Sequence, residues 1–230
     1  MIAKSNSSDD RPEIPPTPEG TYVAVCRGVI GVGTHNTGFK NPKTGKDNWA
    51  NQVVLLFELP TERIEIGGKD VPRGINTFPM TISLGPKANL RKMIETWRGR
   101  KFTDKEAAEG FDLEVLLGQN CLMSVINVEV GEKVYANIGG IIPLPKGSTT
   151  FEPENEVIYY EVDAGMVIPE GTPEWLKIKI FESREMRGHS KDDETGQQNH
   201  QPHVFQSEIA ENERVNEQMV NEEFGVKEEF

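Results

Sequence analysis

The sequence has little of what membrane, secreted and metal-binding proteins usually carry. Among its 230 residues there are only two cysteines, Cys26 and Cys121, and four histidines. Both cysteines lie in alternating apolar runs, so we expect buried thiols in a reducing compartment, without a disulfide framework or a cysteine zinc site. No apolar run approaches the roughly 18 residues of a membrane span, and residues 1–10 lack the apolar segment of a signal peptide.

Sequence motifs that indicate an enzyme are also missing. The chain has no G-x-x-x-x-G-K-[ST], G-x-S-x-G or H-E-x-x-H, and the glycines at 28, 31 and 33 lack the spacing of a dinucleotide-binding loop. Three of the four histidines lie beyond residue 188, in a segment too polar to fix a metal geometry. Nuclease-like carboxylate pairs cannot be told from surface charge in the sequence. We therefore expect no catalytic activity, no metal and no cofactor.

Acidic residues outnumber basic ones, but the two kinds are unevenly distributed. The 37 Asp and Glu against 25 Lys and Arg give a net charge of -12. Residues 27–105 hold 14 bases and 7 acids, residues 106–187 hold 6 bases and 15 acids, and residues 188–230 hold 3 bases and 11 acids. This asymmetry indicates an anionic partner for residues 27–105 despite the overall negative charge.

The apolar pattern predicts one mainly β domain over residues 20–187. A Pro-rich leader (1–19) and a polar, acidic tail (188–230) flank it, and we expect both to be disordered. Runs rich in β-branched and aromatic residues predict strands at 22–30, 52–59, 76–84, 121–130, 134–142 and 157–162, and a hairpin at 63–71. The segment from Thr34 to Ala50 is rich in Gly, Asn and Pro and is predicted to be a long loop.

Between these strands the apolar period changes to that of a helix. Four apolar residues follow the i, i+3, i+4, i+7 spacing of a helix face: Leu90, Met93, Ile94 and Trp97. Pro86 lies at the predicted first turn and Gly99 at the predicted end. Thr103 to Glu106 form a capping-box pattern that predicts a second helix. A third helix is predicted from residue 172 to about residue 184.

The order of these elements predicts the fold class. The predicted order is strand, strand, strand or hairpin, helix, strand, strand. This is the element order of the OB-fold. We therefore predict a mainly β, OB-fold-like five-stranded Greek-key barrel with inserted helices, followed by a C-terminal helix and the disordered tail. Other small β-barrels with an inserted helix also fit this order.

The predicted loop at 34–50 is the best candidate for a binding site in this domain. It combines lysines with aromatic residues: Phe39, Lys40, Lys43, Lys46 and Trp49. Lysines follow phosphates and aromatic rings stack on bases of any sequence, which is the combination that single-stranded nucleic acid requires. The loop joins the first two strands, a binding loop in OB-folds. The alternative is a solvated surface loop whose Trp49 packs into the core.

A second group of basic residues lies around the first predicted helix. Lys87, Arg91 and Arg98 fall within about 40° of one another at 100° per residue. Like charges along one helix face repel each other, so a bound phosphate backbone would explain their position. The alternative is an ordinary solvated helix face that binds no ligand. The predicted DNA-binding residues are Phe39, Lys40, Lys43, Lys46, Trp49, Arg73, Lys87, Arg91, Arg98 and Arg100.

The C-terminal segment carries the most distinctive short motif. Glu-Glu-Phe occurs twice, and the second copy, Glu228, Glu229 and Phe230, ends the sequence. An acidic tail with a terminal Phe resembles those of bacterial and phage single-stranded DNA-binding proteins (SSBs). The resemblance implies that this tip binds a basic, apolar pocket on partner enzymes. The alternative is a tail that only promotes solubility.

A second resemblance covers residues 18–180. It rests on five short motifs: residues 97–100 (WRGR), 102–103 (FT), 111–113 (FDL), 116–118 (LLG) and 144–147 (LPKG). These resemble SSB-like proteins of phage and prophage early regions. The chain departs from bacterial SSBs because it lacks a long Gly/Pro/Gln linker and inserts two helical segments. The bacterial tetramer is therefore not implied, and self-association stays open.

Together these features predict a sequence-non-specific single-stranded DNA-binding protein of phage DNA replication or recombination. Its expected partners are single-stranded DNA and, through the C-terminal tip, phage or host replication and recombination proteins, with no membrane partner. The resemblance implies a cytoplasmic location in the bacterial host cell. Two alternatives remain: a phage adaptor or inhibitor that binds a host protein without contacting DNA, and a small DNA-processing enzyme.

Overall fold

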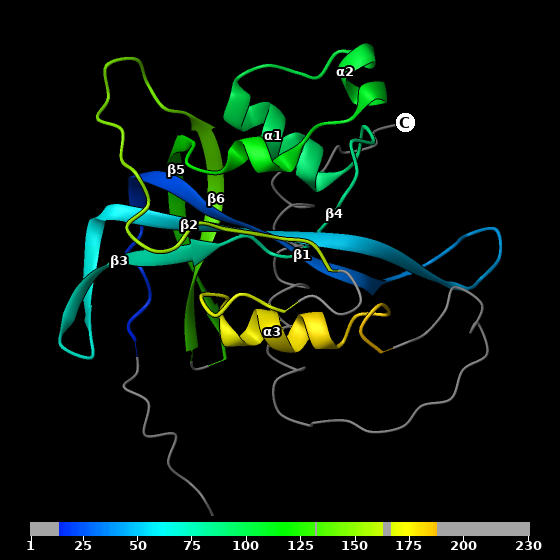
Figure 1. The fold of residues 1–230 in the computed structure, drawn as a ribbon. Coiled ribbons are helices and arrows are strands. Elements are labelled where there is room, and N and C mark those ends of the chain that lie inside the picture. The colour runs from blue at the N-terminus through cyan, green and yellow to red at the C-terminus, as the bar shows by residue number, and fades with distance from the viewer. Residues whose placement is uncertain (1–13, 132, 163–166, 188–230) are drawn as a thin grey trace, which may run out of the picture.

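The computed structural model describes residues 14–131, 133–162 and 167–187. Within them the chain forms one mainly β unit with few helices, built on an open sheet (Figure 1). The elements in chain order are β1 (Gly20–Lys40), β2 (Asp47–Ile66), β3 (Lys69–Asn76), β4 (Met80–Thr81), α1 (Asn89–Arg98), α2 (Asp104–Glu109), the 3-10 helix η1 (Leu113–Leu116), β5 (Asn120–Val130), β6 (Lys133–Pro143), β7 (Ile158–Tyr160) and α3 (Glu174–Phe181).

The sheet has the order β3-β2-β1-β5-β6, with β4 added beside β2 and β7 beside β1. Every pairing is antiparallel except that between β7 and β1. β3 contacts β6 at the two ends of this order, but no strand pairing between them is present among the described residues. The predicted mainly β class is therefore confirmed at the level of an open, largely antiparallel sheet.

β1 and β2 are far longer than their neighbours, and this gives the molecule its shape. β1 pairs with β5 over Gly20–Val25 and with β7 at residues 28–30, whereas β2 pairs with β4 only as far as Gln52. Beyond these points, residues 35–50 pair only with each other. We call this two-stranded extension the arm; it projects from the body at the right of Figure 1.

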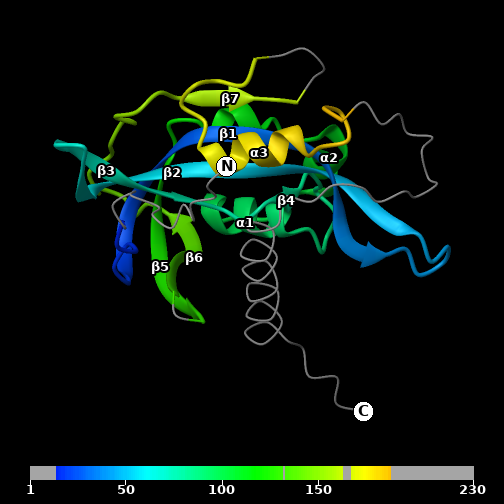
Figure 2. The same cartoon turned by 90° about the horizontal axis from the view of Figure 1, so that it is seen from below.

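Apolar side chains cover both faces of the two central strands. On one face β1, β2 and β5 pack against α1, where the rings of Phe57 and Trp97 lie 5.4 Å apart. On the other face Ile30 and Val54 pack against Leu176 of α3. Figure 2 shows α3 lying along β1 and β2. Burial on both faces explains why β2 is a near-continuous apolar run rather than an alternating one.

A buried carboxylate fixes the segment that leads to β7 and α3. Glu58 of β2 is 1% exposed, and its carboxylate accepts hydrogen bonds from the backbone N–H groups of Glu154 (2.8 Å) and Asn155 (3.0 Å). The side-chain amide of Asn155 adds a third, and the Arg27 guanidinium lies 3.7 Å away. These partners compensate for the free-energy cost of burying the Glu58 carboxylate. They also hold residues 154–155 against β2.

Local helix signals in the sequence are largely confirmed. Leu90, Ile94 and Trp97 are buried on α1, and Gly99 ends it in the left-handed conformation with φ of 67°. Thr103 caps α2 in a complete capping box with Glu106. The predicted start at residue 86 is wrong by three residues, since α1 begins at Asn89 after an extended Ala88.

Several strand boundaries differ from the prediction. Most of the predicted loop at 34–50 is strand, because β1 continues to Lys40 and β2 begins at Asp47. Pro60 does not end its strand; a bulge between Leu59 and Arg63 lets β2 continue. The predicted strand at 76–84 is reduced to Met80–Thr81. The strands at 121–130 and 134–142 are confirmed as β5 and β6, and the last predicted strand is the short β7.

The predicted leader and tail lie mostly outside the described residues. Of the leader, residues 14–19 are described, and they contact the body. The carbonyl oxygen of Pro15 accepts a hydrogen bond from Arg73, that of Pro18 accepts one from Tyr22, and Glu19 accepts one from the backbone N–H of Asn127. The tail at 188–230, with its tip residues, lies wholly outside the described residues.

Candidate nucleic-acid interface

The arm is ordered by its own polar side chains. At the turn, the Asn41 carboxamide oxygen accepts a hydrogen bond from the backbone N–H of Lys43, and the backbone N–H of Asn41 donates to the carbonyl of Lys46. Gly38 has φ of 77°, and its N–H donates to the side chain of Asn36. Such local bonds replace the apolar packing that a two-stranded ribbon lacks.

Two aromatic side chains on the arm remain accessible. Phe39 is 58% exposed and Trp49 is 39% exposed. Trp49 pairs in register with Asn36, so it belongs to the arm rather than to the core. The guanidinium carbon of Arg184 lies 3.8 Å from the centre of the Trp49 ring. The alternative in which Trp49 packs into the core is therefore wrong, and its stacking on a base stays a prediction.

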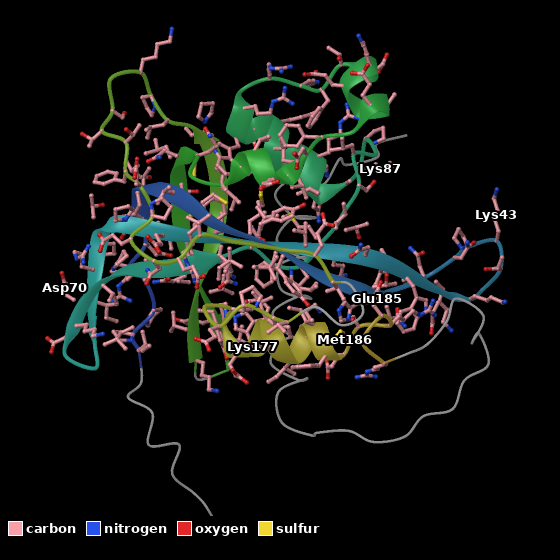
Figure 3. All side chains as sticks on the ribbon, viewed as in Figure 1. Lys43, Asp70, Lys87, Lys177, Glu185 and Met186 are labelled. Atoms are coloured by element: carbon pink, nitrogen blue, oxygen red, sulfur yellow. The ribbon has the colours of Figure 1, made fainter. Side chains whose placement is uncertain are left out.

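The three lysines of the arm are also accessible to solvent. Lys40, Lys43 and Lys46 are exposed, and Lys43 lies at the end of the arm in Figure 3. Lys40 and Lys43 form no ion pair with any described residue. Two unpaired ammonium groups next to accessible rings give the arm both parts of a site for a phosphate-linked base.

The segment that follows α3 is fixed to residues 33–35, which we call the root of the arm. The backbone N–H and hydroxyl of Thr34 donate to the Glu185 carboxylate at 2.8 and 2.6 Å, and the N–H of Arg184 donates to the Thr34 carbonyl at 3.1 Å. Burial alone would raise the pKa of Glu185, but the hydrogen bonds from Thr34 lower it, so this carboxylate stays charged. Figure 3 labels Glu185 at this position.

His35, next to Thr34, is part of the same root. Its Nε2 lies 2.8 Å from the Val32 carbonyl oxygen. Burial lowers the pKa of His35, and the charge of Lys179 lowers it further. A neutral ring that is tied to its own strand supports the arm and leaves phosphate binding to the lysines.

The predicted basic patch around α1 is not a free surface. Arg91 pairs with Glu95 at 2.9 Å, and both Arg98 and Arg100 pair with Glu106 of α2, at 3.0 and 2.8 Å. The Arg98 guanidinium also lies 4.5 Å from the centre of the Phe102 ring. Arg98 and Arg100 thus connect the end of α1 to α2, and Arg91 pairs within α1, so all three arginines have partners without a phosphate backbone.

The two remaining predicted cations differ from each other. Arg73 of β3 donates to the Pro15 carbonyl oxygen at 2.7 Å and lies 3.6 Å from Glu62, so it too has partners within the protein. Lys87 is exposed in the loop before α1 and forms no ion pair with a described residue (Figure 3). The structure thus brings Phe39, Trp49 and the three lysines together on the arm, but not the arginines.

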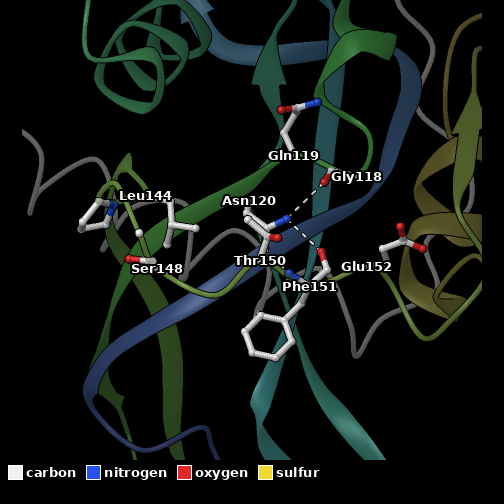
Figure 4. A pocket seen from close by; sticks show the side chains of 10 residues that line it. Gly118, Gln119, Asn120, Leu144, Ser148, Thr150, Phe151 and Glu152 are labelled. Carbon is white, nitrogen blue, oxygen red and sulfur yellow. Dashed lines mark hydrogen bonds between the residues drawn. The ribbon is translucent and has the colours of Figure 1, made fainter.

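A pocket of about 660 Å³ lies away from the arm, between the start of β5 and residues 144–152 (Figure 4). The Asn120 side chain joins its walls, because its amide donates to the Phe151 carbonyl at 2.8 Å and its oxygen accepts from the Phe151 N–H at 2.9 Å. Glu152 is the one charged residue that lines it. A lone carboxylate without a base makes this a poor site for a phosphate.

Other chemistry has little support in the described part of the chain. Cys26 and Cys121 are both buried, as predicted, and burial raises the pKa of each thiol to about 12. Thiols in that state are poor nucleophiles. Among the described residues, no three His, Cys, Asp or Glu side chains gather as a metal site, and no helix is long and apolar enough to cross a membrane.

Comparison with known proteins adds no identification. No protein-family model and no curated protein matches the chain. The geometry of the arm and its root is therefore what supports a function. Arg184 is the residue at this site that sequence reasoning missed. Its one sequence signal is a cation at the end of the predicted third helix, and this does not reveal that it lies over Trp49.

Proposed function

We propose that this chain is a sequence-non-specific single-stranded DNA-binding protein of phage DNA replication or recombination, and that the arm is its main DNA-binding element. The observation that carries the proposal is the arm itself. It projects from the body with Phe39 58% exposed, Trp49 half-exposed, and Lys40 and Lys43 without an ion pair among the described residues. Among the described residues, Lys69, Lys87, Lys92, Lys101 and Lys146 are also exposed without an ion pair, so it is the accessible rings beside its lysines that set the arm apart.

The chemistry of these groups fits single strands better than duplex. Each aromatic ring offers a stacking surface worth about 1–3 kcal/mol per base, and a base is free to stack only when it is unpaired. Rings do not distinguish one base from another, and lysines bind phosphates as point charges, so neither reads sequence. The arm therefore favours unpaired DNA of any sequence.

An OB-fold is the finer description of the body that we propose. The strand order β3-β2-β1-β5-β6, with helices between the third strand and β5, is the order expected of that barrel, and β3 contacts β6 where it would close. The arm then corresponds to the loop between the first two strands. One feature differs, because α3 covers the outer face of β1 and β2. For this reason we assign binding to the arm rather than to a bare sheet face.

We also propose that the tail recruits replication or recombination enzymes. Glu228 and Glu229 would pair with basic side chains of the partner, and the Phe230 ring would fill an apolar pocket beside them. These residues lie outside the described part of the chain, so the proposal rests on the sequence motif and its resemblance to SSB tails.

A fluorescence titration with labelled oligo-dT at two salt concentrations tests the DNA-binding proposal. The logarithm of the affinity should fall with the logarithm of salt concentration, at about -0.7 per phosphate neutralised. A duplex of the same length, titrated in parallel, should bind more weakly because its bases are already stacked. Equal affinity for duplex, or a slope near zero, would refute the proposal.

A further inference from the structure

Arg184 is the one described arginine without a carboxylate partner among the described residues. Each of the other seven has an acidic side chain within 4.0 Å. In a chain with a net charge of -12, an arginine without an acidic partner among the described residues has a charge available for a ligand. It contacts the Thr34 carbonyl through its backbone N–H and the Trp49 ring through its guanidinium.

The position of Arg184 is fixed by its neighbours. Thr34 holds Glu185 by two hydrogen bonds, and Gly33 allows the chain to come this close. A Cβ added at Gly33 would lie 2.5 Å from the Ser183 Cβ and 2.8 Å from the Glu185 carboxylate. Residues 183–185 are thus tied to the root of the arm, and Arg184 is held over Trp49 before any ligand binds.

A stacked guanidinium keeps its hydrogen-bonding capacity. Its N–H groups lie in its own plane, so a ring against its flat face leaves their outer edge for an anion, and this fork geometry suits two phosphate oxygens. Trp49 still has 39% of its surface exposed with Arg184 over one face. The indole and the guanidinium edge can therefore be used at the same time.

We propose that Trp49 and Arg184 form one nucleotide-binding unit: a base stacks on the exposed indole, and the neighbouring phosphate binds the outer edge of the guanidinium. This rests on the proposed function and adds the residues after α3 to the DNA-binding surface. It also gives α3 a role in that surface, because α3 carries Arg184 to the arm.

The test compares Arg184→Ala, Arg184→Lys and the matched control Arg187→Ala in the full chain, titrated with labelled oligo-dT over a range of salt. Arg187 is three residues away, carries the same charge, and lies 3.8 Å from Glu182. Arg184→Ala should weaken binding about tenfold, the size of one charged hydrogen-bonded contact. Its salt slope should be shallower by about 0.7, the loss of one phosphate contact.

The lysine variant and the control separate the two parts of the unit. Arg184→Lys should keep the wild-type salt slope while regaining only part of the affinity, because an ammonium lacks the planar fork. Arg187→Ala should change the affinity less than about threefold. If Arg184→Ala misfolds, as judged by thermal melting, Arg184→Gln, which removes the charge and keeps most of the side chain, takes its place in the comparison with Arg187→Ala.

Three results would overturn the inference. If Arg184→Ala matches Arg187→Ala, Arg184 does not bind the ligand. If the affinity of Arg184→Ala falls at an unchanged salt slope, Arg184 only positions Trp49. If the wild-type chain binds no oligo-dT at all, the proposed function fails, and this inference fails with it; the first two results leave the proposed function intact.

Discussion

Replacing Gly33 by alanine should loosen the attachment between the arm and the residues after α3. Gly33 has φ of 83°, and an added Cβ would lie 2.5 Å from the Ser183 Cβ. Gly38, also on β1, provides a matched control: its φ is 77°, and no atom lies within 4 Å of an added Cβ. Both substitutions carry the left-handed backbone penalty of about 1–2 kcal/mol. Only Gly33→Ala adds overpacking, typically about 1–3 kcal/mol.

The difference between the two variants therefore measures the contact at the root. Gly33→Ala should unfold about 1–3 kcal/mol more easily than Gly38→Ala, or roughly 2–12 °C lower for a domain of this size. The contact can instead relax by releasing residues 183–185, which limits the loss of stability. In that case the melting temperatures converge, but oligo-dT binding weakens only in Gly33→Ala, because Arg184 leaves Trp49. Variants equal in both melting and DNA affinity would refute the reasoning.

Three further outcomes are expected. Phe39→Ala should weaken oligo-dT binding by about 1–3 kcal/mol without lowering the melting temperature, since Phe39 is 58% exposed; unfolding at full DNA affinity would show a structural role. Phe230→Ala should abolish capture of a replication or recombination enzyme in a pull-down while oligo-dT binding persists, and Phe224→Ala, in the internal Glu-Glu-Phe copy, should keep the capture; equal behaviour of the two would argue against a docking tip. Hydrogen bonds, first from Arg100, hold the pKa of Glu106 well below its ordinary value, so its stabilising effect is complete above about pH 4.5 and fades as pH falls below that. Wild-type melting should accordingly fall more steeply below pH 4.5 than that of Glu106→Gln, and parallel curves would contradict this.

Signals confined to a few neighbouring residues could be predicted from the sequence. The apolar spacing of α1 and the capping box of α2 depend on contacts within one or two turns, so local pattern was enough. The prediction of a loop at 34–50 is wrong, and the reason is also local. Its Gly, Asn and Pro content is typical of loops, yet Asn36, Thr37 and Asn41 use their side chains to order a polar ribbon.

Contacts between distant segments could not be predicted in this way. Periodicity placed Arg91 and Arg98 on one helix face, but Glu106 reaches Arg98 and Arg100 only because α2 folds back beside α1. In the same way, Arg184 reaches Trp49 because β7 and α3 pack on β1 and β2. Lys40 and Lys43 differ from the arginines of α1 because no described acidic side chain pairs with them. Such pairing depends on tertiary structure, so the sequence alone could not separate the two groups.

The salt dependence of oligo-dT binding in an arm variant tests the central claim most directly. Lys40→Ala/Lys43→Ala removes two unpaired charges from the arm, and Lys69→Ala/Lys105→Ala removes two exposed lysines elsewhere. If the arm neutralises phosphates, the first variant should have a salt slope shallower by about 1.4, two contacts at 0.7 each, and the second should keep the wild-type slope. Equal slopes in wild type and both variants would contradict the assignment of DNA binding to the arm.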